Sequence, residues 1–165
     1  MARPSTTEAL TPSIFDRLLD NDPERKVEAQ SSRNQIIRDL RESVRRDLEY
    51  LLNTRQSCER LASKWDDLKH SVINFGIPDY TGANLSNEED RIQFAKLIEN
   101  IILANETRFK TVNIKVLSSD DAVDRTFRFR IDALLKVEPA VKPVVFDSSL
   151  EPITRNFHVK DVDSG

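Results

Sequence analysis

Carboxylates are the side chains of this sequence that first suggest catalysis, because 28 of its 165 residues are Asp or Glu. Glycoside hydrolysis by two carboxylates needs one of them in an apolar setting, which raises its pKa so that it can donate a proton. Asp147 and Glu151 are predicted in a polar turn, and Asp66 and Asp67 have polar neighbours. The sequence therefore offers no position for such a pair.

Nucleophilic, metal and nucleotide chemistry also lack the residues that they require. The chain has one cysteine, Cys58, and two histidines, His70 and His158, so no Cys/His zinc motif can be formed. It contains no Gly-x-Ser-x-Gly motif, and its 3 glycines form neither a phosphate-binding loop nor a dinucleotide fingerprint. We therefore expect a protein that is not an enzyme and that binds no metal or cofactor.

The charge balance argues against a nucleic-acid-binding protein. Lys and Arg total 25 and Asp and Glu total 28, a formal net charge of -3, whereas a nucleic-acid-binding domain is usually strongly basic. The single cysteine excludes an intrachain disulfide and suits a reducing compartment. Residues 1–10 do not resemble a secretion signal, and no apolar run reaches the roughly 18–20 residues of a membrane-spanning helix. We expect a cytoplasmic protein.

A pair of opposite charges is the candidate site. Glu106 and Arg108 are two residues apart in the stretch Asn105–Arg108, between an apolar helical segment and a segment with strand periodicity. If this stretch is extended, the two side chains project to the same face. The residues alone leave two interpretations, a contact for a partner or a solvated ion pair worth under about 1 kcal/mol. Composition favours the solvated pair.

The elements that must position this pair are predicted from hydrophobic periodicity. Apolar residues that recur every three or four positions predict helices over 36–52, 61–73 and 86–104. Alternation of apolar and polar residues predicts strands over 112–116, 127–131, 144–146 and 153–159. Helices followed by antiparallel strands predict an α+β domain, with the helices packed on one face of a small, mainly antiparallel sheet.

Three finer features belong to this prediction. Ser86 is the expected N-cap of the third helix, and Glu89 completes a capping box. The polar residues 147–152 are predicted to form the turn between the last two strands. On the first helix, the charged residues from Arg38 to Glu49 form a face that is predicted to be solvated.

The N-terminal residues 1–35 are predicted to form an arm with a short amphipathic helix at about 13–20. Its apolar residues are Ile14, Phe15, Leu18 and Leu19, and residues 24–35 are almost entirely polar. The helix either packs on its own domain or docks in the groove of a partner. The predicted organisation is thus the arm, one α+β domain at 36–160, and a flexible tail at 161–165.

Three stretches together resemble a known family. They are Asp47–Arg55, Ser71–Tyr80 with its Asn-Phe-Gly-Ile-Pro-Asp-Tyr sequence, and the Glu106-Thr107-Arg108 turn before a Val-x-Ile-x-Val strand. In this order they resemble the TssE family of type VI secretion baseplate subunits, which is similar to the baseplate wedge protein that initiates the sheath of contractile phage tails. The resemblance runs from about Ile14 to Val159.

The resemblance implies a structural, non-enzymatic subunit that presents a sheet edge and the Glu106-Thr107-Arg108 turn to the first ring of sheath subunits. The family's turn is Glu-Pro-Arg, and here Thr107 stands in place of the proline. Threonine neither restricts the preceding residue nor removes a backbone donor, so we expect a less rigid turn. The resemblance also implies that alanine at Glu106 or Arg108 leaves the domain folded but abolishes sheath polymerisation.

The partners that the resemblance implies are all proteins. They are baseplate subunits of the TssF, TssG and TssK types, reached in part by the helix at Ile14, Phe15, Leu18 and Leu19, and sheath subunits of the TssB and TssC types. The implied location is the bacterial cytoplasm, in a baseplate docked at the inner-membrane complex. No nucleic acid and no direct membrane insertion are expected.

Two other functions stay open at this point. One is a regulatory anti-adaptor of the same superfamily, which would form a soluble one-to-one complex instead of a multi-subunit baseplate. The other is a lysozyme-like muramidase, which would clear suspensions of purified cell walls and lose this activity in carboxylate variants.

Overall fold

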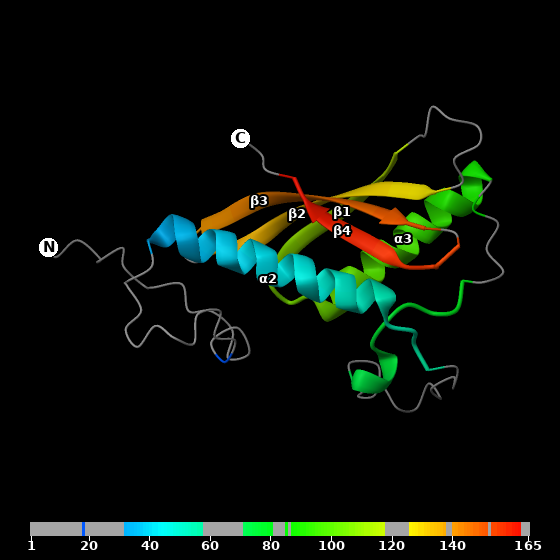
Figure 1. Cartoon of the computed structure of the whole chain (residues 1–165), viewed down its shortest axis with the longest axis horizontal. Coiled ribbons are helices and arrows are strands. Elements are labelled where there is room, and N and C mark those ends of the chain that lie inside the picture. Colours follow the sequence, from blue (N-terminus) through cyan, green and yellow to red (C-terminus); the bar gives the residue numbers. More distant parts are fainter. Residues whose placement is uncertain are drawn as a thin grey trace, which may run out of the picture.

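The computed structural model describes residues 18, 32–57, 71–80, 85, 87–117, 126–137, 140–151 and 153–162. Its helices within these residues are α2 (Arg33–Asn53), the short 3-10 helix η2 (Val72–Asn74) and α3 (Glu88–Asn105). Its strands are β1 (Phe109–Leu117), β2 (Phe127–Val137), β3 (Ala140–Leu150) and β4 (Phe157–Asp161). Figure 1 shows α2 and α3 on the same side of one sheet. The predicted α+β fold is confirmed.

The four strands form an antiparallel sheet in the order β1-β2-β3-β4. Its register places Ile131 of β2 opposite Ile114 of β1 and Phe146 of β3. Residues that are directly opposite lie on the same face of a sheet. Alternate residues of β2 from Phe127 onward therefore form one buried row, while Arg130 and its neighbours in register face away from the helices.

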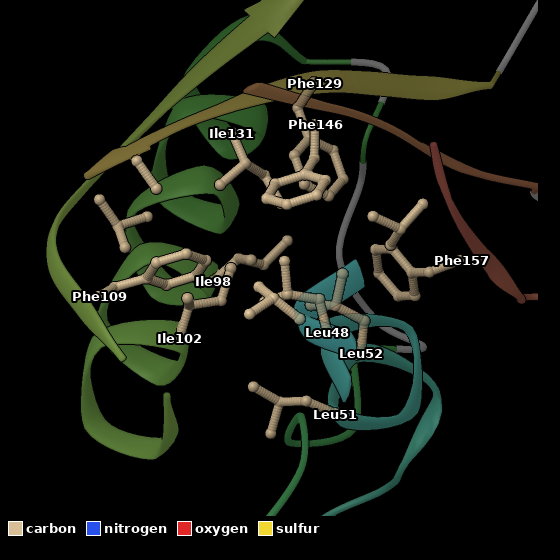
Figure 2. Packing of buried hydrophobic residues seen from close by; sticks show 14 of the residues in the cluster. Leu48, Leu51, Leu52, Ile98, Ile102, Phe109, Phe129, Ile131, Phe146 and Phe157 are labelled. Atoms are coloured by element: carbon tan, nitrogen blue, oxygen red, sulfur yellow. The ribbon is translucent and has the colours of Figure 1, made fainter. Parts of the chain in front are cut away.

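Both helices bury their apolar stripes against this row. Figure 2 shows Leu48 and Leu52 of α2 and Ile98 and Ile102 of α3 in one cluster with Phe129. All five side chains are buried, and each contributes about 1.5–3 kcal/mol by leaving water. Because α2 and α3 share this core, the turn that follows α3 is held close to the side of α2.

The charged face of α2 is partly an interface, so the prediction of a solvated face is wrong in part. Arg41 forms an ion pair of 2.5 Å with Asp161 in β4. Arg45 donates to the carbonyl oxygen of Val159 in the same strand, over 3.2 Å. These charged residues contact β4 because α2 runs beside this strand (Figure 1). The spacing of residues along the helix does not predict this neighbour.

The last two strands differ from the prediction. β3 continues through Asp147 to Leu150, where a turn was predicted, and β4 begins only at Phe157. Ile153 lies in a turn and is exposed. Pairing of the polar residues of β3 across the sheet overrides their turn propensity: Asp147 faces Arg130 at 2.7 Å, and Ser148 is buried in register with Phe129.

The other boundaries shift by a few residues. α2 begins at Arg33 after the N-cap Ser32, so residues 33–35 of the predicted arm are helical. The N-cap of α3 is Asn87, whose side chain accepts from the N–H of Glu89, and the prediction of Ser86 is wrong because Ser and Asn cap equally well. Asp161, in the predicted tail, belongs to β4.

The predicted helix at 61–73 is wrong where it can be compared. Residues 61–70 lie outside the described residues. Val72 and Ile73 begin the short η2, and both side chains are exposed instead of forming an apolar face.

The segment after η2 attaches to the end of α2. The N–H of Ile77 donates to the carbonyl oxygen of Thr54 over 2.8 Å, and the N–H of Gln56 donates to the carbonyl oxygen of Ile77 over 2.9 Å. Gly76 precedes this bridge with a φ of +106°, which side chains of L-residues rarely adopt. Tyr80 then packs on Phe94, with ring centroids 5.2 Å apart. The segment is thus attached to the C-terminal end of α2 and packs on α3.

In the part of the chain that the structure describes, no helix has the length and apolar character needed to cross a membrane. Within the same residues, no group of three or more His, Cys, Asp and Glu side chains could hold a metal ion.

Candidate protein-interaction site

The candidate site is the turn between α3 and β1. α3 ends at Asn105, and Glu106 is its C-cap with an extended backbone at φ -103° and ψ 91°. The N–H of Glu106 still donates to the carbonyl oxygen of Ile102, over 2.8 Å, and the N–H of Phe109 donates back to the carbonyl oxygen of Glu106. These two bonds close a tight turn. Only Thr107 and Arg108 lie between the C-cap Glu106 and the first residue of β1.

Glu106 and Arg108 bind each other inside this turn. The Nε and Nη2 atoms of Arg108 lie 2.7 and 2.5 Å from the two carboxylate oxygens of Glu106, a two-point pairing. The backbone N–H of Arg108 also donates to Glu106 Oε1 over 3.1 Å. Glu106 is only 8% exposed. The interpretation of a solvated ion pair is therefore wrong, because one of the two charges is buried.

Arg108 extends the pair to α2. Its Nη2 atom lies 2.5 Å from Asp47 Oδ2, and its Nη1 atom donates to the hydroxyl of Ser43 over 3.1 Å. Burial lowers the pKa of the Arg108 guanidinium, but the hydrogen bonds and charges of Glu106 and Asp47 outweigh burial and leave that pKa above its ordinary value. Arg108 therefore stays charged and ties the turn to the side of α2.

Sequence reasoning missed Asp47 and Ser43 as members of this cluster. Asp47 is 61 residues from Arg108 along the chain, and no spacing rule connects residues so far apart. Asp47 is the first residue of one stretch that carries the family resemblance, which was the only available signal.

A pocket of about 470 Å³ opens beside the turn. Its floor and walls are formed by α2 and the segment after η2, with Leu48, Leu51 and Phe75 beside the charged residues of the turn. Tyr50 stands at its rim and is 65% exposed. Exposed tyrosine next to apolar surface and fixed charges is typical of protein-binding surfaces.

The turn around Thr107 is bonded to β2. The carbonyl oxygen of Thr107 accepts from Lys136 Nζ over 2.8 Å, and the backbone N–H of Lys136 donates to the carbonyl oxygen of Arg108, also over 2.8 Å. With the Glu106–Arg108 pair, these bonds to β2 hold the turn without a proline. In this chain, these bonds compensate for the absence of the proline.

The backbone is compatible with the proline of the related motif. We expect Thr107→Pro to raise the free energy of unfolding by about 0.5–1 kcal/mol, because proline restricts the unfolded chain. Glu106, at φ -103° and ψ 91°, lies outside the helical region that a following proline disfavours. Among the described residues, the N–H of Thr107 has no acceptor to lose. Urea unfolding measures the change.

A matched control is Thr111→Pro. Thr111 pairs with Leu134 of β2, so proline there removes a bond of the sheet and is expected to destabilise the domain by at least about 1 kcal/mol. A Thr107→Pro variant that unfolds at lower urea than the wild type would contradict the compatibility of the turn.

The predicted docking helix is placed only in part. Ile14, Phe15 and Leu19 lie outside the described residues. Leu18 is described, and its side chain is exposed.

Comparison with known proteins gives one family match. The family model described as baseplate wedge protein gp25 matches residues 38–140, which include most of α2 and all of α3, the Glu106-Thr107-Arg108 turn, β1 and β2. No curated protein and no solved structure matches the chain significantly. TssE is the type VI secretion homologue of gp25. Because the match covers more than half of the sequence, the chain belongs to the baseplate wedge protein gp25 family, a family with a structural role among the components of phage-tail-like baseplates.

Proposed function

We propose that this protein is a non-enzymatic baseplate subunit of a type VI secretion system, which links the baseplate to the contractile sheath and initiates sheath polymerisation. The observation that carries the proposal is the Glu106-Thr107-Arg108 turn, whose two charges match those of the TssE motif. They bind each other, and Arg108 also binds Asp47 of α2, beside an open pocket. The family membership supports the baseplate part of this role.

The geometry suits docking because the turn is already ordered. Four of the five N–H groups of the Arg108 guanidinium are used inside the subunit, by Glu106, Asp47 and Ser43. One N–H on Nη1 remains for an acceptor on a partner, and the rim tyrosine offers apolar contact next to it. A partner that docks here meets a donor whose position is already fixed, so binding costs little conformational entropy.

The partners in this proposal are baseplate subunits of the TssF, TssG and TssK types and sheath subunits of the TssB and TssC types. The segment that carries Ile14, Phe15, Leu18 and Leu19, predicted from the sequence to be a helix, contributes to the baseplate contact. The complex resides in the bacterial cytoplasm, in a baseplate docked at the inner-membrane complex, without nucleic acid and without insertion of this subunit into the membrane.

The experiment that tests the function is co-purification from cells that express the tagged chain, followed by identification of the bound proteins. Baseplate and sheath subunits are the expected result. A soluble one-to-one complex with a regulatory protein would instead support the anti-adaptor function. Clearing of purified cell walls by the chain, lost in carboxylate variants, would support a muramidase.

Tyr50→Ala tests the role of the pocket in binding without disturbing the fold. We expect this variant to capture about tenfold less sheath subunit, since an exposed interface tyrosine contributes about 1–2 kcal/mol to binding, while its free energy of unfolding changes by less than about 0.5 kcal/mol. The matched control is Leu103→Ala, which truncates an exposed apolar side chain of α3 that does not line this pocket. Equal capture by both variants would argue against the pocket as the sheath contact.

A further inference from the structure

In the described part of the chain, α-helices cover only one face of the sheet. Both α2 and α3 pack on the side of Phe129 and Ile131 (Figure 1). The outward residues of the strands alternate with this buried row and form the outer face, on which Leu134 of β2 lies opposite Thr111 of β1 and Pro143 of β3. An antiparallel sheet often exposes one face to water, and the residues of that face are then polar.

The outer face is apolar at one end. Val141, Pro143 and Val145 are alternate residues of β3, so they share this face, and Leu134 lies directly across from Pro143. Val141 is 42% exposed, Pro143 is exposed, and Leu134 and Val145 are half-buried. We call these four residues the outer patch. A contiguous exposed apolar patch with polar residues around it is typical of a protein-binding surface.

The rest of the outer face is positive, although the whole chain has a formal net charge of -3. Asp132 pairs with Lys115 at 2.6 Å and Asp147 pairs with Arg130 at 2.7 Å, so both carboxylates are neutralised on the face itself. Such a surface is complementary to an apolar surface flanked by carboxylates. In the described part of this face, the basic residues outnumber the acidic Asp132 and Asp147; they are Lys115, Arg128, Arg130, Lys136 and Lys160.

Pro143 makes the outer patch unsuitable for an added strand. The register of β3 with β4 begins at Phe146, and the carbonyl oxygen of Val145 accepts from the N–H of Val162 on that side. Alternate residues of an antiparallel strand direct their backbone groups to the same side, so position 143 would present its N–H there as well, but proline has none. A partner of the outer patch therefore contacts side chains on the face of the sheet.

Two other occupants fit this face less well. Two copies placed face to face would bring the basic residues of both copies together, and like charges destabilise such a contact. A nucleic acid would place phosphates beside Asp132 and Asp147, and the apolar end of the face gives it no charge to pair with. A protein with apolar and acidic side chains meets both ends of the face favourably.

The outer patch borders the candidate interaction site. Lys136 lies opposite Val141 in the register, its Nζ donates to the carbonyl oxygen of Thr107 over 2.8 Å, and its N–H donates to the carbonyl oxygen of Arg108. Lys136 thus connects the outer patch with the turn. The pocket beside the turn is lined by residues of α2, on the other side of the sheet, so the two surfaces can be occupied at the same time.

We propose that the outer patch is a second protein-binding surface, and that its occupant is a baseplate subunit with an apolar surface flanked by carboxylates. The inference rests on the proposed function for the identity of the partner, because the turn and its pocket are assigned there to the sheath. The subunit then holds the baseplate on the outer face of its sheet and the sheath at the turn, with Lys136 between the two contacts.

Val141→Asp tests the outer patch, with purified baseplate subunits of the TssF and TssG types as the probe. We expect about tenfold weaker binding, because the new carboxylate meets an apolar surface and other carboxylates on the partner. Capture of sheath subunits should stay at the wild-type level. Val72→Asp is the matched control, since Val72 is 85% exposed on η2 and does not belong to the outer face. Urea unfolding checks that both full-length variants are folded.

Lys160→Glu tests the charge of the face without changing its apolar end. Lys160 is exposed in β4 and lies opposite Asp147. We expect the variant to bind the same baseplate subunits about fivefold more weakly at low salt, and the difference should shrink at high salt because exposed charges are screened. Lys96→Glu is the matched control, because Lys96 is an exposed lysine of α3 on the other side of the sheet.

The outcomes separate the outer patch from the proposed function. Equal binding of baseplate subunits by the wild type, Val141→Asp and Lys160→Glu would overturn the outer patch and leave the proposed function intact. Failure of these subunits to bind the wild-type chain would overturn the baseplate part of the proposed function, and this partner with it. A wild-type dimer in sedimentation that Val141→Asp dissociates would identify a second copy as the occupant, and binding of duplex DNA that Lys160→Glu abolishes would identify a nucleic acid. Either result would overturn the proposal.

Discussion

Glu106→Ala is expected to lower the free energy of unfolding by about 2–3 kcal/mol, the cost of leaving a part-buried charged donor without one of its partners. The carboxylate is buried and accepts three hydrogen bonds from Arg108. Without it, the guanidinium would keep only Asp47 and Ser43 in a partly buried position, and the turn would lose its internal bond to the Arg108 N–H. Urea unfolding monitored by circular dichroism measures the loss.

The expectation that alanine at Glu106 leaves the domain folded therefore applies to a less stable domain. Asp47→Asn is the matched control, because Asp47 contacts the same guanidinium from a more exposed position, and we expect it to cost no more than about 1 kcal/mol. The Glu106→Ala, Arg108→Ala double variant should be less destabilised than the sum of the single variants, since the two residues act as one unit.

A Glu106→Ala variant within about 0.5 kcal/mol of the wild type would show that the pair contributes as little as solvated charges do. Sheath assembly by the variants is best measured at a temperature where each is folded. Loss of assembly in a folded Arg108 variant then reports the contact, and not the loss of the fold.

Gly76→Ala is expected to lower the free energy of unfolding by about 3 kcal/mol. A Cβ atom built at this position would lie 2.4 Å from the carbonyl oxygen of Thr54, and the φ of +106° is unfavourable for alanine. The same carbonyl oxygen accepts from the N–H of Ile77, so a shift that relieves the clash also strains the bridge to α2. Thermal unfolding followed by circular dichroism measures the change.

The effect should reach the candidate site as well, because Phe75 lines the pocket beside the turn. Asp79→Ala in the same segment is the control, since Asp79 is exposed and its ion pair with Arg55 is long, at 3.8 Å; we expect a change below about 1 kcal/mol. A Gly76→Ala variant as stable as this control would contradict the requirement for glycine.

The alternation of apolar and polar residues predicted strands correctly where one face of the strand is buried. The strands at 112–116 and 127–131 were predicted from alternation, and they are parts of β1 and β2. The strand predicted at 144–146 is also part of β3, but its continuation through Asp147 and Ser148 was not predicted, because these polar residues are extended through pairing with β2 and β4. Turn propensity is a local property, whereas a ladder of hydrogen bonds is provided by residues distant in the chain.

The sequence by itself determined the fold class, the position of the charged turn and the resemblance that the family match confirmed, because periodicity and motifs reside in neighbouring residues. Only the tertiary structure decided that Glu106 is buried, that Arg108 binds Asp47, and that the charged face of α2 contacts β4. The physical reason is the same in each case. Which charges and backbone groups meet depends on how α2 and α3 pack across one sheet, and that packing joins residues that no local spacing relates.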